Sequence, residues 1–269
     1  MQFTTDGLVI REVNVGDNDK MLTILTPERG RMGVMAKGSR SLKSQTLATA
    51  QLYTYGNYEI YEKGDFHWLR GGSVIEGFFG LRGDIEKIAL AAYLADLAYE
   101  FTGEELPSVE ILRMTLNAFY VLAGGLKPLA IVKGVYELRG AGFSGFMPEL
   151  SHCAKCHGTE GDTFYLDVMN GRMICSRCMR QKSNGLRTLW QMEQERGGDE
   201  RERSVLLPMS GSVWTAVRYA LAALPERMFS FSLDGAEELR MFSKVAEEYL
   251  LHHLERGFSS LDFYKSLFT

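Results

Sequence analysis

The chain has 269 residues, of which 45% are apolar and 24% are charged, and its formal net charge is −4. These values are typical of a globular protein, and they exclude a disordered chain, a fibrous repeat and a uniformly basic nucleic-acid coat. No uncharged apolar run approaches the roughly 18 residues that cross a bilayer, and residues 1–13 lack the pattern of a secretion signal. We therefore expect a soluble cytoplasmic protein with one large domain or two ordinary ones.

The first 80 residues have a strand-like pattern, in which apolar side chains alternate with polar ones. Strands are expected at residues 7–15, 20–26, 31–37, 51–55, 57–62 and 66–75. Pro27 and Gly30 favour a turn between the second strand and the third. Such a series of short strands favours a small closed barrel over an open sheet.

The periodicity becomes helical after residue 80. Helices are expected at residues 84–101, 108–123, 128–140, 186–195, 212–224 and 234–256. Ser108 and Asp234 are the expected N-caps of two of them, because short polar side chains accept hydrogen bonds from unpaired backbone amides. Residues 193–203 carry eight charges around two glycines and indicate an exposed loop.

All four cysteines of the chain occur in two CxxC pairs: Cys153, Cys156, Cys175 and Cys178. Two such turns can place four thiolates around one metal ion, and residues 163–174 with Asn170-Gly171 indicate a hairpin between them. Because four thiolates leave no position for water, the spacing predicts a structural Zn²⁺ site and not a catalytic one. Iron, two unrelated CxxC motifs, and His152 or His157 as a substitute ligand stay open as alternatives.

Two basic groups are candidates for contact with nucleic acid. Five cations and no acid occur between residues 29 and 43: Arg29, Arg31, Lys37, Arg40 and Lys43. A second group surrounds the later cysteine pair: Arg172, Arg177, Arg180, Lys182 and Arg187. Cations that neutralise phosphates release counterions, which favours binding, but the same pattern also suits a solvated surface.

Four tyrosines lie on the strands expected near the first basic group: Tyr53, Tyr55, Tyr58 and Tyr61. Their rings offer faces on which unpaired bases can stack. The alternative is that they fill the core of the barrel. The pattern alone does not decide between the two.

Signatures of common enzyme classes are missing from the chain, among them GxxxxGK[ST], HExxH and GxSxG. His252-His253 is expected to be a helix-end feature and not a catalytic pair. We therefore expect a binding protein with no catalytic residues.

Seven segments, taken in order, resemble the RecO family of bacterial recombination mediators. They are GLVIR from residue 7, LTILT from 22 with ERGR from 28, AKGSR from 36 with Lys43-Ser44, YELR from 136 with Gly142-Phe143, PEL from 148 with CAKC from 153, YLLHH from 249, and SSL from 259. Each is weak alone, but their order and spacing are specific, and the resemblance covers nearly the whole chain.

The resemblance implies an α+β protein with an OB-fold barrel over residues 1–80. An α-helical domain over residues 81–269 would follow, with a Cys₄ zinc-ribbon-like module inserted at residues 150–182. It also implies that the protein binds single- and double-stranded DNA and anneals complementary strands without ATP. From the two basic groups we expect the barrel cations to hold the phosphate backbone, with Arg172, Arg177 and Arg180 added by the helical domain.

The expected partners also follow from the resemblance. Working with RecR, the protein would help load RecA onto DNA covered by the single-strand binding protein SSB, in the cytoplasm and near the nucleoid. Family members recognise the acidic, apolar C-terminal tail of SSB through their helical domain. Lys133 and Arg139 are the candidate cations at the rim of that groove.

Two other classes of function stay open. An interaction scaffold without nucleic-acid binding suits the acidic charge balance, and it predicts no oligonucleotide binding at low salt. A metal-dependent hydrolase requires an open coordination position on the metal.

Overall fold

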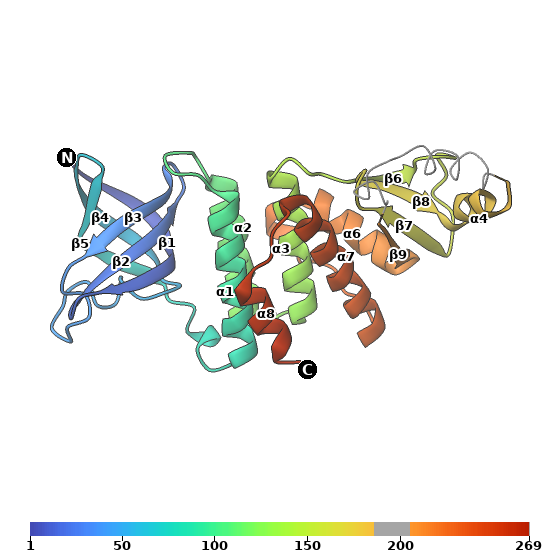
Figure 1. The fold of residues 1–269 in the computed structure, drawn as a ribbon. Helices are drawn as coiled ribbons and strands as arrows, with labels where there is room; N and C mark the ends of the chain where they lie inside the picture. Colours follow the sequence, from blue (N-terminus) through green and yellow to red (C-terminus); the bar gives the residue numbers. More distant parts are fainter. Residues whose placement is uncertain (186–204, 269) are drawn as a thin grey trace. The chain divides into compact units, whose positions relative to one another are not determined.

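A computed structural model describes residues 1–185 and 205–268 and divides the chain into two compact units (Figure 1). The first unit consists of Met1–Leu129 and Phe258–Thr269, and the second consists of Ala130–Gly257. Within the described residues, the helices are all too short or too polar to span a membrane. The predicted helix at 186–195, the charged loop at 193–203 and Arg187 lie outside the described residues.

The first unit begins with the closed barrel that the sequence predicts. Its strands are β1 (Gln2–Val15), β2 (Asp19–Thr26), β3 (Gly30–Ala36), β4 (Tyr55–Lys63) and β5 (Phe66–Glu76). They pair in the order β1-β2-β3-β5-β4, and β4 pairs with β1 to close the barrel (Figure 1). Inward side chains such as Val9, Leu22, Ile24, Tyr58 and Ile60 fill its core.

The strand expected at residues 51–55 is not formed, apart from Tyr55, which begins β4. Tyr53 adopts a left-handed conformation with φ of 63°, which ends any extended run. Its amide donates to the carbonyl of Val9, and the amide of Val9 donates to the carbonyl of Thr54. The segment therefore lies against β1 as a turn.

Three helices complete the first unit: α1 (Ile85–Phe101), α2 (Val109–Ala123) and α8 (Ser259–Ser266), with a short 3₁₀ turn at Phe79–Leu81. Asp84 caps α1, because its carboxylate accepts from the amides of Glu86 and Lys87. Ser108 precedes α2 as predicted, but its hydroxyl donates to the carbonyl of Leu106 and makes no capping bond.

The described part of the second unit contains the longer helices α3 (Leu129–Phe143), α6 (Gly211–Ala222) and α7 (Ala236–Leu254), with a 3₁₀ turn at Pro225–Arg227. Ser210 caps α6 by accepting from the amide of Val213. The cap predicted at Asp234 is wrong: Gly235, with φ of 89°, occupies the cap position without a side-chain bond.

A four-stranded sheet and the short helix α4 (Ser176–Gly185) carry the cysteines. The strands are β6 (Glu149–Cys153), β7 (Thr163–Asp167), β8 (Arg172–Cys175) and β9 (Leu206–Ser210), in the order β6-β8-β7-β9. β7 and β8 form the predicted hairpin around Asn170-Gly171. Strand β9 was not predicted, because Pro208 weakens its strand signal, but an edge strand tolerates proline.

Candidate metal centre and nucleic-acid interface

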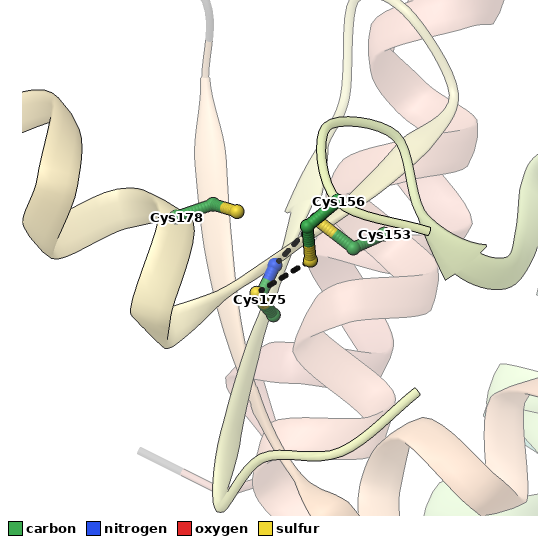
Figure 2. A group of neighbouring side chains, drawn as sticks. All are labelled: Cys153, Cys156, Cys175 and Cys178. Atoms are coloured by element: carbon green, nitrogen blue, oxygen red, sulfur yellow. Dashed lines mark hydrogen bonds between the residues drawn. The ribbon is translucent and has the colours of Figure 1, made fainter. Parts of the chain in front are cut away.

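The four cysteine side chains converge from two strands, a turn and a helix (Figure 2). Cys153 ends β6, Cys156 lies in the following turn, Cys175 ends β8, and Cys178 lies in the first turn of α4. All four sulfur atoms lie within 4.8 Å of one another. The Sγ atoms of Cys156 and Cys175 are 3.7 Å apart, and a tetrahedral Zn–S bond of about 2.3 Å implies an S–S separation of about 3.8 Å. The cluster therefore has the dimensions of a Cys₄ metal site.

Hydrogen-bond donors around the sulfur atoms favour thiolates. The amide of Cys175 donates to Sγ of Cys153 at 3.4 Å, and Nη2 of Arg177 lies 3.9 Å from Sγ of Cys156. The pKa of Cys156 is lowered to about 6, first by the backbone N–H of Gly158. Burial raises the pKa of Cys178 to about 12, so this thiol needs a bound cation to ionise. The donor set fits a structural metal whose four ligands all come from the protein.

The two histidines that flank the first pair lie outside this cluster. The rings of His152 and His157 face each other with centroids 5.0 Å apart, and Nδ1 of His152 is 2.7 Å from Oγ of Ser151. The cluster uses the four cysteines alone, in agreement with their spacing in the sequence.

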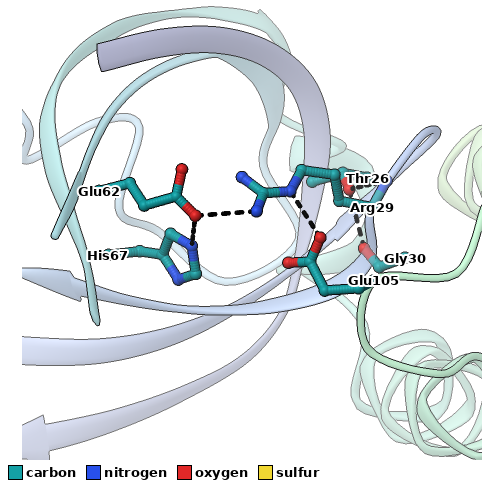
Figure 3. Close-up of polar contacts among 6 residues, drawn as sticks. All are labelled: Thr26, Arg29, Gly30, Glu62, His67 and Glu105. Atoms are coloured by element: carbon teal, nitrogen blue, oxygen red, sulfur yellow. Dashed lines mark hydrogen bonds and ion pairs between the residues drawn. The ribbon is translucent and has the colours of Figure 1, made fainter. Parts of the chain in front are cut away.

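Arg29 binds two carboxylates within the first unit (Figure 3). Its Nη2 is 2.9 Å from Glu62, and its Nε is 2.8 Å from Glu105. These hydrogen bonds raise the pKa of Arg29, and the bond from Arg29 lowers the pKa of Glu62. Arg29 sits in the β2–β3 turn that Thr26 closes through its hydroxyl, 2.9 Å from the carbonyl of Gly30 (Figure 3). Its charge is largely matched inside the unit.

Arg31 also makes contacts within the first unit. Its Nη1 donates to the backbone carbonyl of Tyr99 at 2.6 Å, and its guanidinium lies 4.0 Å from the centroid of the Tyr99 ring. Arg11 lies 3.7 Å from that centroid. Arg31 therefore anchors the barrel to α1.

The other three cations of the barrel group are exposed: Lys37, Arg40 and Lys43. Nη1 of Arg40 donates to the carbonyls of Asp17 and Gly16 at 2.9 and 3.3 Å, which orients the side chain without removing its charge. These residues follow β3 in a loop held by the amide of Gly38, which donates to Asp19 at 2.7 Å. The loop presents positive charge on the barrel surface.

The basic residues around the second cysteine pair are also exposed: Arg172, Arg177 and Arg180. Arg172 begins β8, whereas Arg177 and Arg180 lie one turn apart on α4. All three belong to the same small module. Arg177 lies beside the metal cluster through its contact with Cys156.

Lys133 and Arg139, expected at the rim of a groove, make bonds inside the second unit. Lys133 is 2% exposed, and its ammonium lies 2.8 Å from both Glu137 and Glu247. Nη1 of Arg139 donates to the carbonyls of Ala220 and Ala223, at 3.0 and 2.9 Å, where α6 ends. The sequence does not reveal these contacts, because partners of both side chains within the second unit are distant in the chain.

An apolar groove with cations at its edge occurs elsewhere in the second unit. It lies between β9 and α7 and is lined by Leu207, Pro208, Met241 and Val245, with Glu237, Arg240 and Lys244 around them. Sequence reasoning missed it, because the groove requires the pairing of β9 with the sheet.

Two of the four tyrosines are buried: Tyr58 in the barrel core, and Tyr53 against α2. Tyr58 is fully buried and donates to the carbonyls of Thr49 and Thr54 at 3.2 and 3.0 Å. Tyr53 packs edge-on against Phe119 with ring centroids 5.2 Å apart. Tyr55 and Tyr61 are half-exposed. The core alternative therefore holds for Tyr53 and Tyr58.

Comparison with known proteins covers both units. A family described as "Recombination protein O N terminal" matches residues 1–78, and one described as "Recombination protein O C terminal" matches residues 82–192. The chain is 30% identical over 264 residues to the DNA repair protein RecO of Acetivibrio thermocellus, covering 98% of this chain and 96% of the relative. It is 31% identical over 176 residues to the RecO of Bacillus subtilis, covering 65% of this chain and 68% of that protein. The RecO of Caldicellulosiruptor saccharolyticus is 27% identical over 175 residues, covering 65% and 71%.

Proposed function

The chain belongs to the RecO family of DNA repair and recombination proteins, and from this we propose that it is a mediator that binds single- and double-stranded DNA and anneals complementary strands without ATP. With RecR it would help load RecA onto SSB-coated DNA, in the cytoplasm and near the nucleoid. The observation that carries the proposal is the match to a RecO protein over 98% of the chain.

Exposed cations on the barrel support the DNA-binding part of the proposal. Lys37, Arg40 and Lys43 would contact phosphates, because their charges face solvent on one loop. Arg29 and Arg31 would act mainly by holding the barrel surface in shape, since their guanidinium groups already have partners within the unit. Arg172, Arg177 and Arg180 would add a second phosphate-binding surface on the cysteine module.

Annealing by such a surface needs no catalytic residue and no ATP. Two strands repel each other through their phosphates, and cations that neutralise both strands lower this repulsion and raise the rate of encounter. We therefore propose that the protein is not an enzyme. Its contribution would be binding and alignment.

The groove between β9 and α7 supports an SSB contact. The acidic, apolar tail expected for SSB requires an apolar floor and cations at the edge. Met241 and Val245 supply such a floor, and Arg240 and Lys244 supply the cations. We place the tail here and not at Lys133 and Arg139, which are bound inside the unit.

The cysteine cluster would hold Zn²⁺ as a structural ion. When bound, zinc would cross-link β6, β8 and α4 with four thiolates and leave no open position for catalysis. Because the four thiolates come together only in the folded module, metal binding would contribute to its folding free energy.

The test is annealing of two complementary labelled oligonucleotides without nucleotide cofactor, first naked and then coated with SSB. Acceleration of both reactions would support DNA binding and the SSB contact. Acceleration of naked strands alone would keep the basic surface and remove the SSB contact. If folded, metal-loaded protein accelerated neither reaction, the interaction scaffold would replace the proposal.

A further inference from the structure

A row of apolar side chains runs around the outer wall of the barrel. In the strand register Val13 lies opposite Met21, Met21 opposite Met35, Met35 opposite Trp68, and Trp68 opposite Tyr61. Directly paired residues project from the same face of a sheet. Val13 is 62% exposed and Met21 is 38% exposed, so this face is the outer one. Polar side chains are the usual occupants of a solvent-facing side, so the row requires an explanation.

The row ends in a cluster of aromatic rings. Phe66 is 68% exposed, and its centroid lies 6.0 Å from that of Trp68, with 32° between the ring planes. The centroids of Tyr61 and Trp68 lie 5.9 Å apart, with 39° between the planes. The guanidinium of Arg70 lies 5.0 Å from the Tyr61 centroid. Three rings and one cation thus lie together on the surface of the β4–β5 hairpin.

Cations of the basic loop lie next to this cluster. Strands β3 and β5 are parallel, and Met35 pairs with Trp68. Lys37 follows Met35 by two residues, and Arg70 follows Trp68 by two residues, so both cations lie on the same side of the row. Lys37 opens the loop that carries Arg40. Rings suited to bases and cations suited to phosphates are therefore adjacent.

We propose that unpaired bases of single-stranded DNA stack on Phe66, Trp68 and Tyr61 while Arg70 and Lys37 contact the neighbouring phosphates. Single-strand binding surfaces combine aromatic platforms and cations in this way. Bases within a duplex are already stacked on each other, so the rings discriminate in favour of single strands. The inference rests on the proposed DNA binding. It adds that the outer surface of the β4–β5 hairpin takes part in binding and that single strands are preferred.

The first experiment compares wild-type protein with Trp68→Leu, which removes the ring and keeps an apolar side chain next to Met35. Binding of labelled oligo(dT) and of a duplex is measured by fluorescence anisotropy over a series of salt concentrations. Loss of one stacking platform should weaken oligo(dT) binding about 5- to 160-fold. Duplex affinity and the salt dependence of both should stay at wild-type values, because no phosphate contact is removed.

A matched control is Tyr120→Leu, since Tyr120 is 63% exposed on α2 and lies outside the barrel. This variant loses an exposed ring of similar size, and it should bind both ligands as the wild type does. Equal weakening by both variants would mean that any loss of exposed aromatic surface matters, which would overturn the assignment.

A strand with abasic sites isolates the bases from the phosphates. Wild-type protein should bind the abasic strand more weakly than oligo(dT), whereas Trp68→Leu should bind the two more nearly alike. If the variant retains wild-type affinity for every ligand, the proposal of base stacking on this face is wrong, whereas the proposed DNA binding is still supported. If wild-type protein binds no DNA, the proposed function itself fails.

Photochemical cross-linking tests the face in the unaltered protein, so it does not depend on the variant folding. A strand containing 5-iododeoxyuridine couples on irradiation to an aromatic side chain that contacts its base. We expect adducts on the peptide that contains Phe66 and Trp68. Adducts found only on other peptides would overturn the proposal.

Discussion

Lys133 on α3 and Glu247 on α7 form a buried ion pair, with Nζ 2.8 Å from the carboxylate. Glu137, one turn along α3, binds the same ammonium at 2.8 Å, and Oγ of Ser243 lies 3.4 Å away. The group joins two helices, and Lys133 and Glu137 are almost fully removed from water while the Glu247 side chain is 13% exposed. A cation in this position serves the stability of the second unit and cannot also meet a partner at the surface.

Replacing Lys133 with Ala should therefore destabilise the second unit. The change leaves two carboxylates without the ammonium between them, and breaking a buried pair in this way typically costs about 3–5 kcal/mol of unfolding free energy. Urea denaturation followed by circular dichroism measures the loss. Lys244→Ala, which changes an exposed lysine of α7, is the control and should stay within about 0.5 kcal/mol of the wild type. Equal stability of Lys133→Ala and wild type would contradict the burial of this pair.

Replacing both Lys37 and Arg40 with Ala should weaken binding to DNA of any sequence and make that binding less dependent on salt. The slope of log K against log salt is negative, and each lost phosphate contact on a single strand reduces its magnitude by about 0.7. Titrations of an oligonucleotide at several salt concentrations give the slope. Arg113→Ala removes a cation from α2 whose side chain is 51% exposed, and it should leave the slope unchanged. An unaltered slope in the double variant would remove these two residues from the interface.

Removing one cysteine ligand should release the metal and unfold the cysteine module. In Cys175→Ser the tetrahedral site loses a thiolate from the end of β8, and the free energy of metal binding is coupled to folding. Elemental analysis should find one zinc per wild-type chain and a substoichiometric amount in the variant. Hydrogen exchange should accelerate in β6, β7 and β8 while β1–β5 stay protected. Iron in the wild type would change the assigned metal, and full zinc occupancy in the variant would contradict the Cys₄ site.

The second unit should lose stability as the pH falls through the range of histidine ionisation. His253 stacks on Phe146 with centroids 4.7 Å apart and lies 3.0 Å from the carbonyl of Val168. Burial lowers its pKa below the ordinary value of 6.5. The unfolded chain therefore binds the proton more readily, so the stability contributed by neutral His253 is present above pH 6.5 and is lost as the pH falls toward the folded-state pKa.

The measurement is the urea midpoint at about pH 8 and about pH 5, the two ends of the range in which histidine changes its charge. His253→Phe keeps an aromatic ring beside Phe146 but cannot ionise, so its midpoint should fall less than that of the wild type. An equal fall in both proteins would show that other groups account for the pH dependence.

Much of the architecture could be predicted from local patterns. Alternating side chains identify β1, β2 and β3 because a strand places successive residues on opposite faces, and helical spacing identifies α1 and α2 in the same way. The two CxxC turns predict the metal cluster because each turn brings its own pair of sulfur atoms together and a hairpin joins the two. These features depend on residues close to one another in the chain.

Tertiary structure decided which charged and aromatic side chains are available to a ligand. Arg29 is bound to Glu62 and Glu105, while Tyr58 points into the barrel and Trp68 lies on its outer wall beside Met35. Each outcome depends on a partner that is distant in sequence, and on the register in which the strands pair. A cation or an aromatic ring has the same chemical groups whether it is buried or exposed, so the sequence alone determines its chemistry. Burial and pairing determine whether those groups reach solvent.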